Sequence, residues 1–363
     1  GQVREALNAY PDPTFGLQKR PGLKFLTVLK DSEGNAYNNT DLDNAKWFYI
    51  HRDNDEKYIG CIVGAASSPY GEIHIWNASQ PSAATTITYA SGSREYLKAV
   101  TKNDYHILTV QDTSIITNKT QTVGVQAANS FNAKRKATIR LRGVDNSAAY
   151  RVYITVGGTV YDPIYTSDST ATAAEILTGL KTQIDAESIS NLTVTKLNGS
   201  LELTHSSAAF TVTTQGGLNG QQLSSYGDQV NTVADLPTEA VHNRTVKIIN
   251  TSSSADDYYA KFNADTGAGV SEGYWEETLG YGMSPGLDAA TMPHELVNTG
   301  TNAFTFRPIN WTDRLVGDDT TNSHPSFNGK KIQQAFFYNN RLGFLSEDNV
   351  SMSQSGEFYN LYH

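Results

Sequence analysis

Short β-rich runs that recur about every ten residues are the feature that most constrains how this chain can fold. In the first third of the chain each run has four to six residues, and turn residues separate it from the next. Strands this short and this evenly spaced predict an antiparallel meander, and therefore a sandwich, a barrel or a propeller. No repeat of 40–50 residues is evident, so periodicity alone does not select the propeller. The runs span residues 47–52, 58–63, 72–76, 86–89, 106–110 and 114–117.

Changes of pattern divide the chain into three stretches, residues 1–127, 128–240 and 241–363. The first and third consist of β runs, and we expect them to form one β body into which the middle stretch is inserted. The chain begins without Met and stops inside a strand-like run, so we expect both ends to be truncated and the third stretch to continue. The Gly-, Gln- and Ser-rich segment 216–225 predicts a linker that leaves the middle stretch.

The middle stretch contains the only clear helix pattern in the sequence, over about residues 172–187. Thr172, followed three residues later by Glu175, fits a capping box in which each side chain accepts a backbone N–H of the other residue. Strand patterns on both sides of the helix, including one over residues 160–164, predict a compact β-α-β module. The apolar positions that define one face of the helix are Ile176, Leu177, Leu180 and Ile184.

Composition excludes several classes of protein. The net charge is −9, whereas a general binder of nucleic acid or of anionic membranes is expected to be basic. The single cysteine, Cys61, rules out internal disulfides and CxxC zinc sites, and its apolar neighbours predict a buried structural thiol. No apolar run approaches the ~18–20 residues that a membrane span needs, so we expect no stable membrane insertion of this segment. Abundant Gly, Ser, Thr, Asn and Tyr are typical of an extracellular-type β protein or of a particle protein.

Motifs for enzyme chemistry are incomplete. Residues 294–298 fall one residue short of a zincin motif, because Asn298 stands where the second zinc-binding His would be. No phosphate-binding loop and no nucleophile elbow occurs. We therefore expect no catalytic residue, no cofactor and no metal site, although the Asp-x-Asp pairs at 41/43 and 53/55 leave weak calcium binding open.

Clusters of carboxylates are the remaining sequence feature that could indicate an enzyme. A glycosidase needs two carboxyl groups that converge on one sugar, whereas adjacent residues of a strand point to opposite faces. Solvated turns and a half-buried strand are the more ordinary interpretation of these clusters. The densest clusters are Asp53/Asp55/Glu56, Glu276/Glu277 and Asp318/Asp319.

Several passages, taken in their order and spacing, together resemble one family. Each is weak alone, but the ordered set is similar to the N-terminal half of the tail nozzle proteins (tail tubular protein B) of short-tailed phages, the podoviruses. The passages are residues 15–22 (FGLQKRPG), 258–262 (YYAKF), 275–278 (WEET), 292–297 (MPHELV), 325–329 (PSFNG), 340–346 (NRLGFLS), 349–353 (NVSMS) and 358–360 (FYN).

The resemblance implies a structural virion protein of the phage tail, not an enzyme. Members of this family form a homo-hexameric tube at the distal end of the tail, below an adaptor ring made of tail tubular protein A. Tail fibres dock near the junction of the two rings, and double-stranded DNA passes through the lumen during ejection. The resemblance also implies a mainly β fold, with an antiparallel, β-propeller-like body that carries inserted domains.

Charge is compatible with such a channel. Six copies of a chain of charge −9 would carry −54, and residues 241–363 hold −6 of each chain's charge. An acidic lumen repels the phosphate backbone, so DNA can slide through it, whereas basic walls would bind DNA through counterion release. We hypothesise that the lumen is acidic; a lumen lined mainly by Lys and Arg would contradict this.

Two positions stand out as contact residues. Lys19 and Arg20 precede Pro21-Gly22, which marks an exposed turn, and they are our candidates for contact with the adaptor or with a neighbouring subunit. Arg341 begins a predicted strand with Leu342 and Phe344, and it is expected to make a structural hydrogen-bond fork to backbone carbonyls or to a carboxylate instead.

Two alternatives from other classes stay open. Aromatic content and scattered carboxylates are compatible with a carbohydrate-binding or carbohydrate-degrading phage tail protein. A secreted bacterial β-propeller or adhesin is the other alternative, and it would need an export signal that this sequence does not display.

Overall fold

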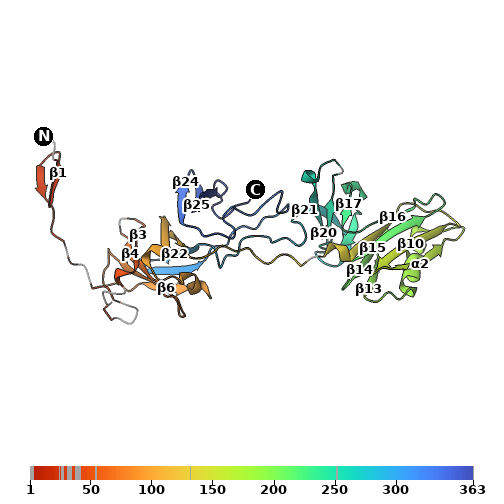
Figure 1. Ribbon diagram of the computed structural model, residues 1–363, viewed down its shortest axis with the longest axis horizontal. Coiled ribbons are helices and arrows are strands. Elements are labelled where there is room, and N and C mark those ends of the chain that lie inside the picture. Colours follow the sequence, from red (N-terminus) through yellow and green to blue (C-terminus); the bar gives the residue numbers. More distant parts are fainter. Residues whose placement is uncertain are drawn as a thin grey trace. The chain divides into compact units, whose positions relative to one another are not determined.

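The computed structural model describes residues 4–23, 25, 28–30, 35–36, 42–53, 55–130, 132–250 and 252–362, and it is mainly β (Figure 1). The chain forms two compact units, both discontinuous in sequence. The first comprises Gly1–Gln121, Met292–Ile309 and Ile332–Phe336. The second comprises Thr122–Thr291, Asn310–Lys331 and Phe337–His363.

The first unit contains a small hairpin and two larger sheets. Strands β1 (Ala9–Asp12) and β2 (Gly16–Lys19) form the hairpin, and β3 (Lys46–His51), β4 (Lys57–Val63) and β5 (Glu72–Asn77) form an antiparallel meander. A five-stranded sheet has the order β6-β23-β22-β8-β7. Its strands are β6 (Thr86–Tyr89), β7 (Tyr105–Val110), β8 (Thr113–Asn118), β22 (His294–Gly300) and β23 (Ala303–Pro308).

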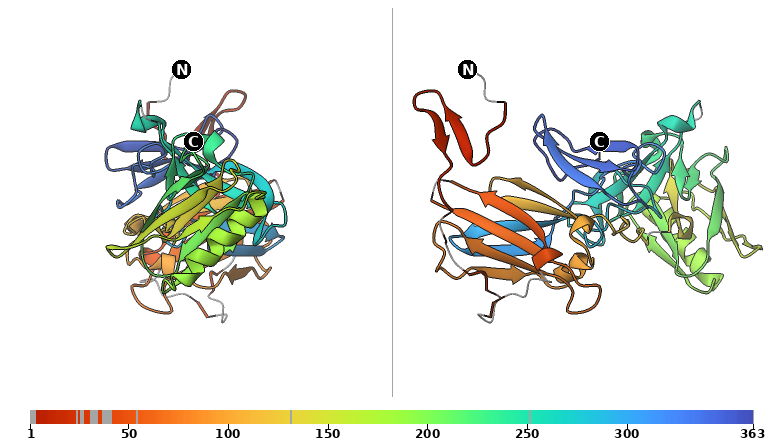
Figure 2. Two further views of the ribbon diagram at one scale, coloured as in Figure 1. Left: turned by 90° about the vertical axis from the view of Figure 1, so that its right-hand side faces the viewer. Right: turned by 60° about the vertical axis from the view of Figure 1, so that its left-hand side comes forward.

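Strands from distant parts of the sequence complete this five-stranded sheet. β22 pairs antiparallel with β8, and β23 pairs in parallel with β6. The right-hand view of Figure 2 shows these light-blue strands lying among the orange and brown strands of the first unit. The chain must therefore leave the sheet after β8 and return to its centre more than 170 residues later.

One apolar core joins the two larger sheets of the first unit. Strand β5 alternates buried with partly exposed residues, as expected for a sheet with one face against a core. The ring of Tyr58 meets that of Phe304 edge-on, with 5.0 Å between ring centroids. The Tyr58 hydroxyl donates to a Glu56 carboxylate oxygen (3.0 Å) and accepts from the Asn302 backbone N–H (3.1 Å), so its burial leaves no polar atom unpaired. A propeller is not confirmed by the described strands.

His294, the first residue of the incomplete zincin motif, belongs to this core. It lies on strand β22, so the motif has no helical face. Its imidazole stacks on the ring of Tyr96 at 4.1 Å between centroids, and its Nδ1 lies 2.9 Å from the carbonyl oxygen of Met292. Burial lowers the pKa of His294 to about 4, which keeps the imidazole neutral at physiological pH.

Two sheets and a helix form one core in the second unit. The first sheet has the order β13-β14-β9-β16, and in the second β10 pairs with β11, β12 and β15. The helix α2 (Ala173–Ala186) buries Ile176, Leu177, Leu180 and Ile184 against them, which confirms the predicted face. The strands are β9 (Lys136–Leu141), β10 (Ala149–Val156), β11 (Thr159–Tyr161), β12 (Ile164–Thr166), β13 (Leu192–Lys196), β14 (Ser200–His205), β15 (Phe210–Gly216) and β16 (Leu223–Tyr226).

The predicted capping box is confirmed, and two local predictions are wrong. Thr172 Oγ1 accepts from the Glu175 N–H (3.3 Å), and a Glu175 carboxylate oxygen accepts from the Thr172 N–H (2.8 Å). The strand predicted over residues 160–164 is divided into β11 and β12, because Pro163 has no N–H for a ladder. The predicted linker 216–225 is structured: β15 extends to Gly216, and β16 begins at Leu223.

A second five-stranded sheet follows, with the order β17-β19-β20-β21-β18. It buries Phe262 against Trp275, at 5.2 Å between ring centroids. Its strands are β17 (Gln229–Val230), β18 (Glu239–Val241), β19 (Thr245–Ile248), β20 (Tyr258–Ala264) and β21 (Val270–Thr278). The last strands are β24 (Gln334–Tyr338), β25 (Arg341–Ser346) and β26 (Asn349–Met352). Short 3-10 helices are η1 (Ser93–Leu97), η2 (Lys102–Asp104), η3 (Ala133–Arg135), η4 (Val233–Asp235) and η5 (Ser254–Asp256).

Three arginines stabilise the second unit from inside. Arg244 lies 3.7 Å from Glu202, both fully buried, and its Nη2 donates to the Gly227 carbonyl (2.6 Å). Burial raises the pKa of Glu202, and the facing Arg244 guanidinium opposes that rise. Arg314 donates from Nε to the Ser284 carbonyl (2.9 Å). Arg341 donates to a backbone carbonyl, that of Ser353 (2.9 Å), as its predicted structural role requires, although through one bond and not a fork.

The buried imidazole of His294 predicts a pH-dependent stability. Between pH 6.5 and about 4 the unfolded chain binds a proton at this residue and the folded chain does not. The contribution of neutral His294 to the free energy of unfolding is complete above pH 6.5. It is lost as the pH falls through about 4, and the loss is roughly 3 kcal/mol. Urea unfolding at pH 7, 5.5 and 4 measures this loss.

The control for His294 is His294→Phe, which keeps a ring against Tyr96 but does not titrate. Its absolute stability should be lower, and its free energy of unfolding should change less with pH. Part of the slope should remain, because burial also lowers the pKa of His106 and His324. An unchanged slope in His294→Phe would contradict the prediction.

Candidate partner-binding site

The β1–β2 hairpin, which carries Lys19 and Arg20, is built by specific turn chemistry. Asp12 Oδ1 accepts from the backbone N–H groups of Thr14 and Phe15, both at 2.8 Å. Gly16 has a φ of +75°, a left-handed conformation that glycine adopts without steric cost. Across the strands, the Tyr10 hydroxyl donates to Gln18 Oε1 at 2.9 Å. The chain therefore encodes a defined hairpin, not an irregular loop.

The structure places the two predicted contact residues side by side at the end of this hairpin. Lys19 is the last residue of β2 and pairs with Ala9 of β1. Arg20 follows, and its backbone N–H donates to the Asn8 carbonyl at 2.8 Å. Both side chains are exposed, and neither takes part in an ion pair with a described residue. Residues 21–22 are exposed as predicted but form irregular chain instead of a turn.

Large apolar side chains around the basic pair are also exposed. Phe15 is 75% exposed at the hairpin tip, Leu17 is 61% exposed on β2, and Leu23 is 92% exposed just beyond Arg20. None of these residues belongs to a described core cluster of the protein. Sequence reasoning missed this surface. The signal was present in the alternation of Phe15 and Leu17 beside turn residues.

A second apolar surface lies on the outward side of the β3–β4–β5 sheet, and we call it the aromatic face: Trp47, Tyr49, Ile59 and Trp76. Trp47 is 41% exposed, Tyr49 is 51% exposed, and Ile59, which pairs directly with Tyr49, is 38% exposed. The indoles of Trp47 and Trp76 stack at 5.9 Å between centroids. Their N–H groups donate to the chain's own carbonyls, at Leu42 and Lys30 respectively. The alternation Trp47-x-Tyr49 could have revealed this face from the sequence.

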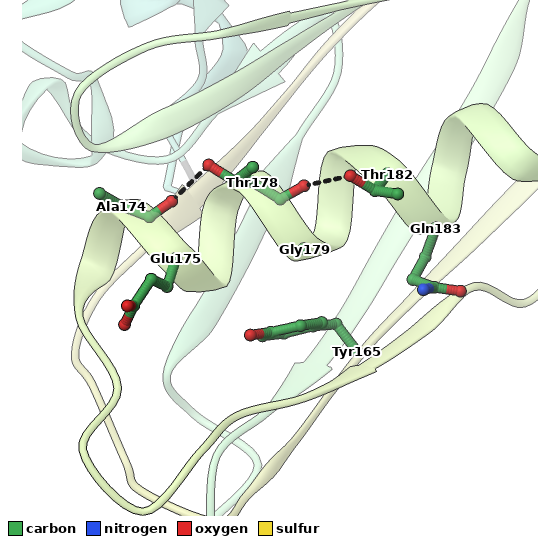
Figure 3. A pocket seen from close by; sticks show the side chains of 7 residues that line it. All are labelled: Tyr165, Ala174, Glu175, Thr178, Gly179, Thr182 and Gln183. Carbon is green, nitrogen blue, oxygen red and sulfur yellow. Dashed lines mark hydrogen bonds between the residues drawn. The ribbon is translucent and has the colours of Figure 1, made fainter.

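The depression along helix α2 carries no convergent chemistry. This depression has a volume of about 430 Å³. Figure 3 shows the ring of Tyr165 beneath Gly179. A Cβ at Gly179 would overlap that ring, so the glycine allows the helix to pack on it. The one carboxylate in the lining, Glu175, is held in the capping box. Thr178 and Thr182 donate to helix carbonyls one turn earlier.

A larger groove of about 620 Å³ lies beside the edges of β5 and β6. The Tyr89 hydroxyl from β6 bonds to the backbone of Ile73, accepting from its N–H at 2.8 Å. Thr85 Oγ1 donates to the Ile75 carbonyl. These side chains satisfy backbone groups at the edge of β5 and thus connect the two sheets of the first unit.

The predicted carboxylate clusters have structural partners. Glu276 forms an ion pair with Lys261 (3.1 Å), and a hydrogen bond from Asn263 together with this pair lowers its pKa. Glu277 is its neighbour on strand β21 and so points to the other face of the sheet. Asp318 Oδ1 accepts from the N–H groups of Thr320 and Thr321, at 2.9 and 3.0 Å.

Metal-binding and membrane-spanning features are not found in the part of the chain that the structure describes. No group of three or more His, Cys, Asp or Glu side chains there could hold a metal ion. Asp41, one member of the predicted Asp-x-Asp pairs, lies outside the described residues. No described helix has the length and apolar character needed to cross a membrane. Cys61 is a free, buried thiol as predicted, and burial raises its pKa to about 12.

Comparison with known proteins identifies the family. A family model described as bacteriophage nozzle protein matches residues 1–363. The chain belongs to the bacteriophage nozzle protein family. It is also 29% identical over 379 residues to tail tubular protein gp12 of Escherichia phage T7, covering 99% of this chain and 44% of that protein. The chain thus spans less than half the length of this relative.

Membership of the nozzle family confirms the resemblance found in the sequence. The chain is a structural component of the phage tail, and its place is in the virion. In a particle of many chains, surfaces that stay exposed in one chain are covered in the assembly. The hairpin and the aromatic face are therefore the surfaces to consider first as contacts.

The Asp12 turn makes the hairpin testable by hydrogen exchange. Asp12→Ala removes the acceptor for two backbone N–H groups, and should speed exchange across β1 and β2 roughly fivefold, equivalent to about 1 kcal/mol. The melting temperature should not change, because the hairpin shares no described core with the rest of the chain. Thr14→Ala, in which no side-chain bond to the turn is lost, is the control. A lower melting temperature for Asp12→Ala alone would contradict this independence.

Proposed function

We propose that this nozzle-family chain is a subunit of a homo-hexameric tail tube through which the genome is ejected. In this proposal the ring binds the adaptor ring (tail tubular protein A), helps to dock the tail fibres and encloses the channel for double-stranded DNA. The observation that carries the proposal is the match of the nozzle model to the whole chain. Because the chain spans 44% of its relative, other parts of such a protein would contribute to these tasks.

The fold is compatible with a β body that carries an inserted module. Residues 294–308 complete a sheet that residues 86–118 begin, so the intervening chain is an excursion from that sheet. We propose that residues 128–240 are the inserted β-α-β module, and that residues 1–127 and 241–363 belong to a propeller-like β body. The second unit extends on both sides of the proposed module, from Thr122 to Thr291. The proposed boundaries are therefore open to refinement by limited proteolysis.

The charge of the chain supports a channel that does not hold DNA. A net charge of −9 per chain, with −6 in residues 241–363, would repel the phosphate backbone from an acidic wall. Passage without specific binding requires this lack of attraction, since Lys and Arg that neutralise phosphates would release counterions and retain the DNA.

A carbohydrate-active tail protein is the alternative. The exposed rings of the aromatic face favour sugar binding, because aromatic side chains supply large apolar surfaces for stacking. The carboxylate clusters do not favour sugar cleavage, since each is engaged in a turn, a strand or an ion pair. We propose that the chain is not an enzyme. Release of sugars from host capsule by the purified protein would support the alternative.

Electron microscopy of the purified protein, alone and with its adaptor protein, tests the proposed function. We expect six-fold rings with a central channel that stack on the adaptor ring, and a lumen wall in which acidic side chains outnumber basic ones. If the protein stays monomeric and does not bind the adaptor protein, the proposal is overturned.

Charge removal at the hairpin tests the predicted contact residues. Lys19→Ala combined with Arg20→Ala should reduce the fraction of protein in assembled rings, because it removes two exposed cations from a contact surface. Lys134→Ala combined with Lys196→Ala removes the same charge from exposed positions of the proposed module and should not reduce it. Equal assembly of the two double variants and the parent protein would show that Lys19 and Arg20 make no essential contact.

A further inference from the structure

We infer that the β1–β2 hairpin of each copy docks on the aromatic face of a neighbouring copy of this chain. The inference rests on the proposed ring assembly and names the partner of the hairpin within it. A ring of identical chains needs a head-to-tail contact, in which each chain offers two different and complementary patches. Both patches occur within the first unit: an apolar hairpin with a basic pair, and an apolar face with an acidic turn.

The hairpin has the properties of a preformed docking element. Its turn is held by the Asp12 carboxylate and by the left-handed Gly16, so the conformation is set before binding. Such order lowers the entropy lost on association. A two-stranded hairpin is at best marginally stable alone in water, and in this one Phe15 and Leu17 stay largely exposed. Covering these side chains on a partner would remove apolar surface from water.

The aromatic face offers a matching surface. Tyr49 and Ile59 are cross-strand neighbours on the outward side of the sheet, and both remain exposed. Trp47 extends the row along β3. Strand β4 is paired on both sides, with β3 and with β5, so around Ile59 the face presents side chains and no open ladder groups. It therefore fits apolar side chains such as Phe15 and Leu17.

Charge favours this pairing of surfaces. Lys19 and Arg20 follow Leu17 and Gln18, whereas the turn that joins β3 to β4 carries the exposed carboxylates of Asp53 and Asp55. In each patch the charged pair adjoins the apolar row, with opposite sign. Over longer range, residues 1–25 carry a net charge of +2, and the remaining residues carry −11. Opposite potentials of this kind steer and orient association.

The chain leaves room for the hairpin to reach a second copy. The Lys30 carbonyl accepts from the Trp76 indole N–H at 3.3 Å, so the chain is attached to its own sheet at that residue. Arg20 and Lys30 are ten positions apart in the sequence, so the chain between them can span at most ~33–36 Å. Within the single chain, the apolar side chains of the hairpin and of the aromatic face are both exposed. In the part of the chain that the structure describes, the two patches thus do not cover each other.

Cysteine cross-linking tests the inference directly. Cys61 is buried and its pKa is raised to about 12, so its thiol is unreactive. Only the introduced cysteines are therefore available to form a disulfide. Phe15→Cys and Tyr49→Cys are made in separate copies of the protein, one carrying an affinity tag, and are co-expressed so that mixed rings form. After oxidation we expect a disulfide-linked dimer that contains one copy of each variant. The control replaces Tyr49→Cys with Val160→Cys, an exposed apolar position on β11, and should yield at least tenfold less dimer.

The outcomes separate this inference from the proposed function. Rings that form normally but give no more dimer than the control would overturn the docking and leave the ring assembly standing. A protein with both substitutions that cross-links only within single chains would also overturn it, because the hairpin would then cover its own face. If the parent protein forms no ring, the proposed function fails and the docking fails with it.

A charge exchange gives a second, independent readout. Lys19→Glu combined with Arg20→Glu should lower the cross-linking yield several-fold, because like charges would then face each other. Adding Asp53→Lys and Asp55→Lys to the partner copy should restore most of the yield. If the cross-linking yield stays low in the combined variant, although the circular dichroism spectra are unchanged, the assigned pairing of the two patches is contradicted.

Discussion

The pairing of β22 and β23 with β8 and β6 is the interaction on which the first unit depends. Without residues 294–308, the backbone groups along β6 and β8 would be open edges, and Tyr58 would lose the ring of Phe304. To complete the sheet, the chain must leave it after β8 and return to it at β22. More than 170 residues lie between these two strands. The return of Met292–Ile309 to the first unit follows from this requirement.

Several of the buried polar side chains in both units have partners that offset the cost of their burial. His294 stays neutral and stacks on Tyr96, and the Tyr58 hydroxyl has a donor and an acceptor. Glu202 is held between Arg244 and the hydroxyl of Thr138, which donates to it at 2.6 Å. Removing one partner of such a buried pair is costly, because the remaining charge has no water to solvate it. These groups contribute to the specificity of the fold.

The hairpin and the aromatic face differ from these buried groups, because their large side chains are not covered. Both expose large apolar side chains, although the sequence provides clear secondary structure for each. A tail protein must remain folded as a single chain and still offer surface for assembly, so apolar contacts belong on rigid, preformed elements. Membership of the nozzle family gives such surfaces a reason to exist, and their charges suggest how copies would be oriented.

Local chemistry was readable from the sequence, whereas long-range pairing was not. Thr172 and Glu175 define the start of α2 through contacts three residues apart, and Ile176 to Ile184 define its buried face, so the helix was predictable. The strands of the first third were predictable for the same reason, since alternation and turns are local. The predictions of a strand over residues 160–164 and of a linker over residues 216–225 were wrong. Whether Pro163 divides a strand and whether Gly216 continues one depends on which neighbouring strands supply hydrogen bonds. The sequence also identified the family and the exposure of Lys19 and Arg20. Only the tertiary structure decided that Phe304 packs on Tyr58 and that Trp47, Tyr49 and Phe15 stay uncovered, because burial depends on contacts between residues far apart in the chain.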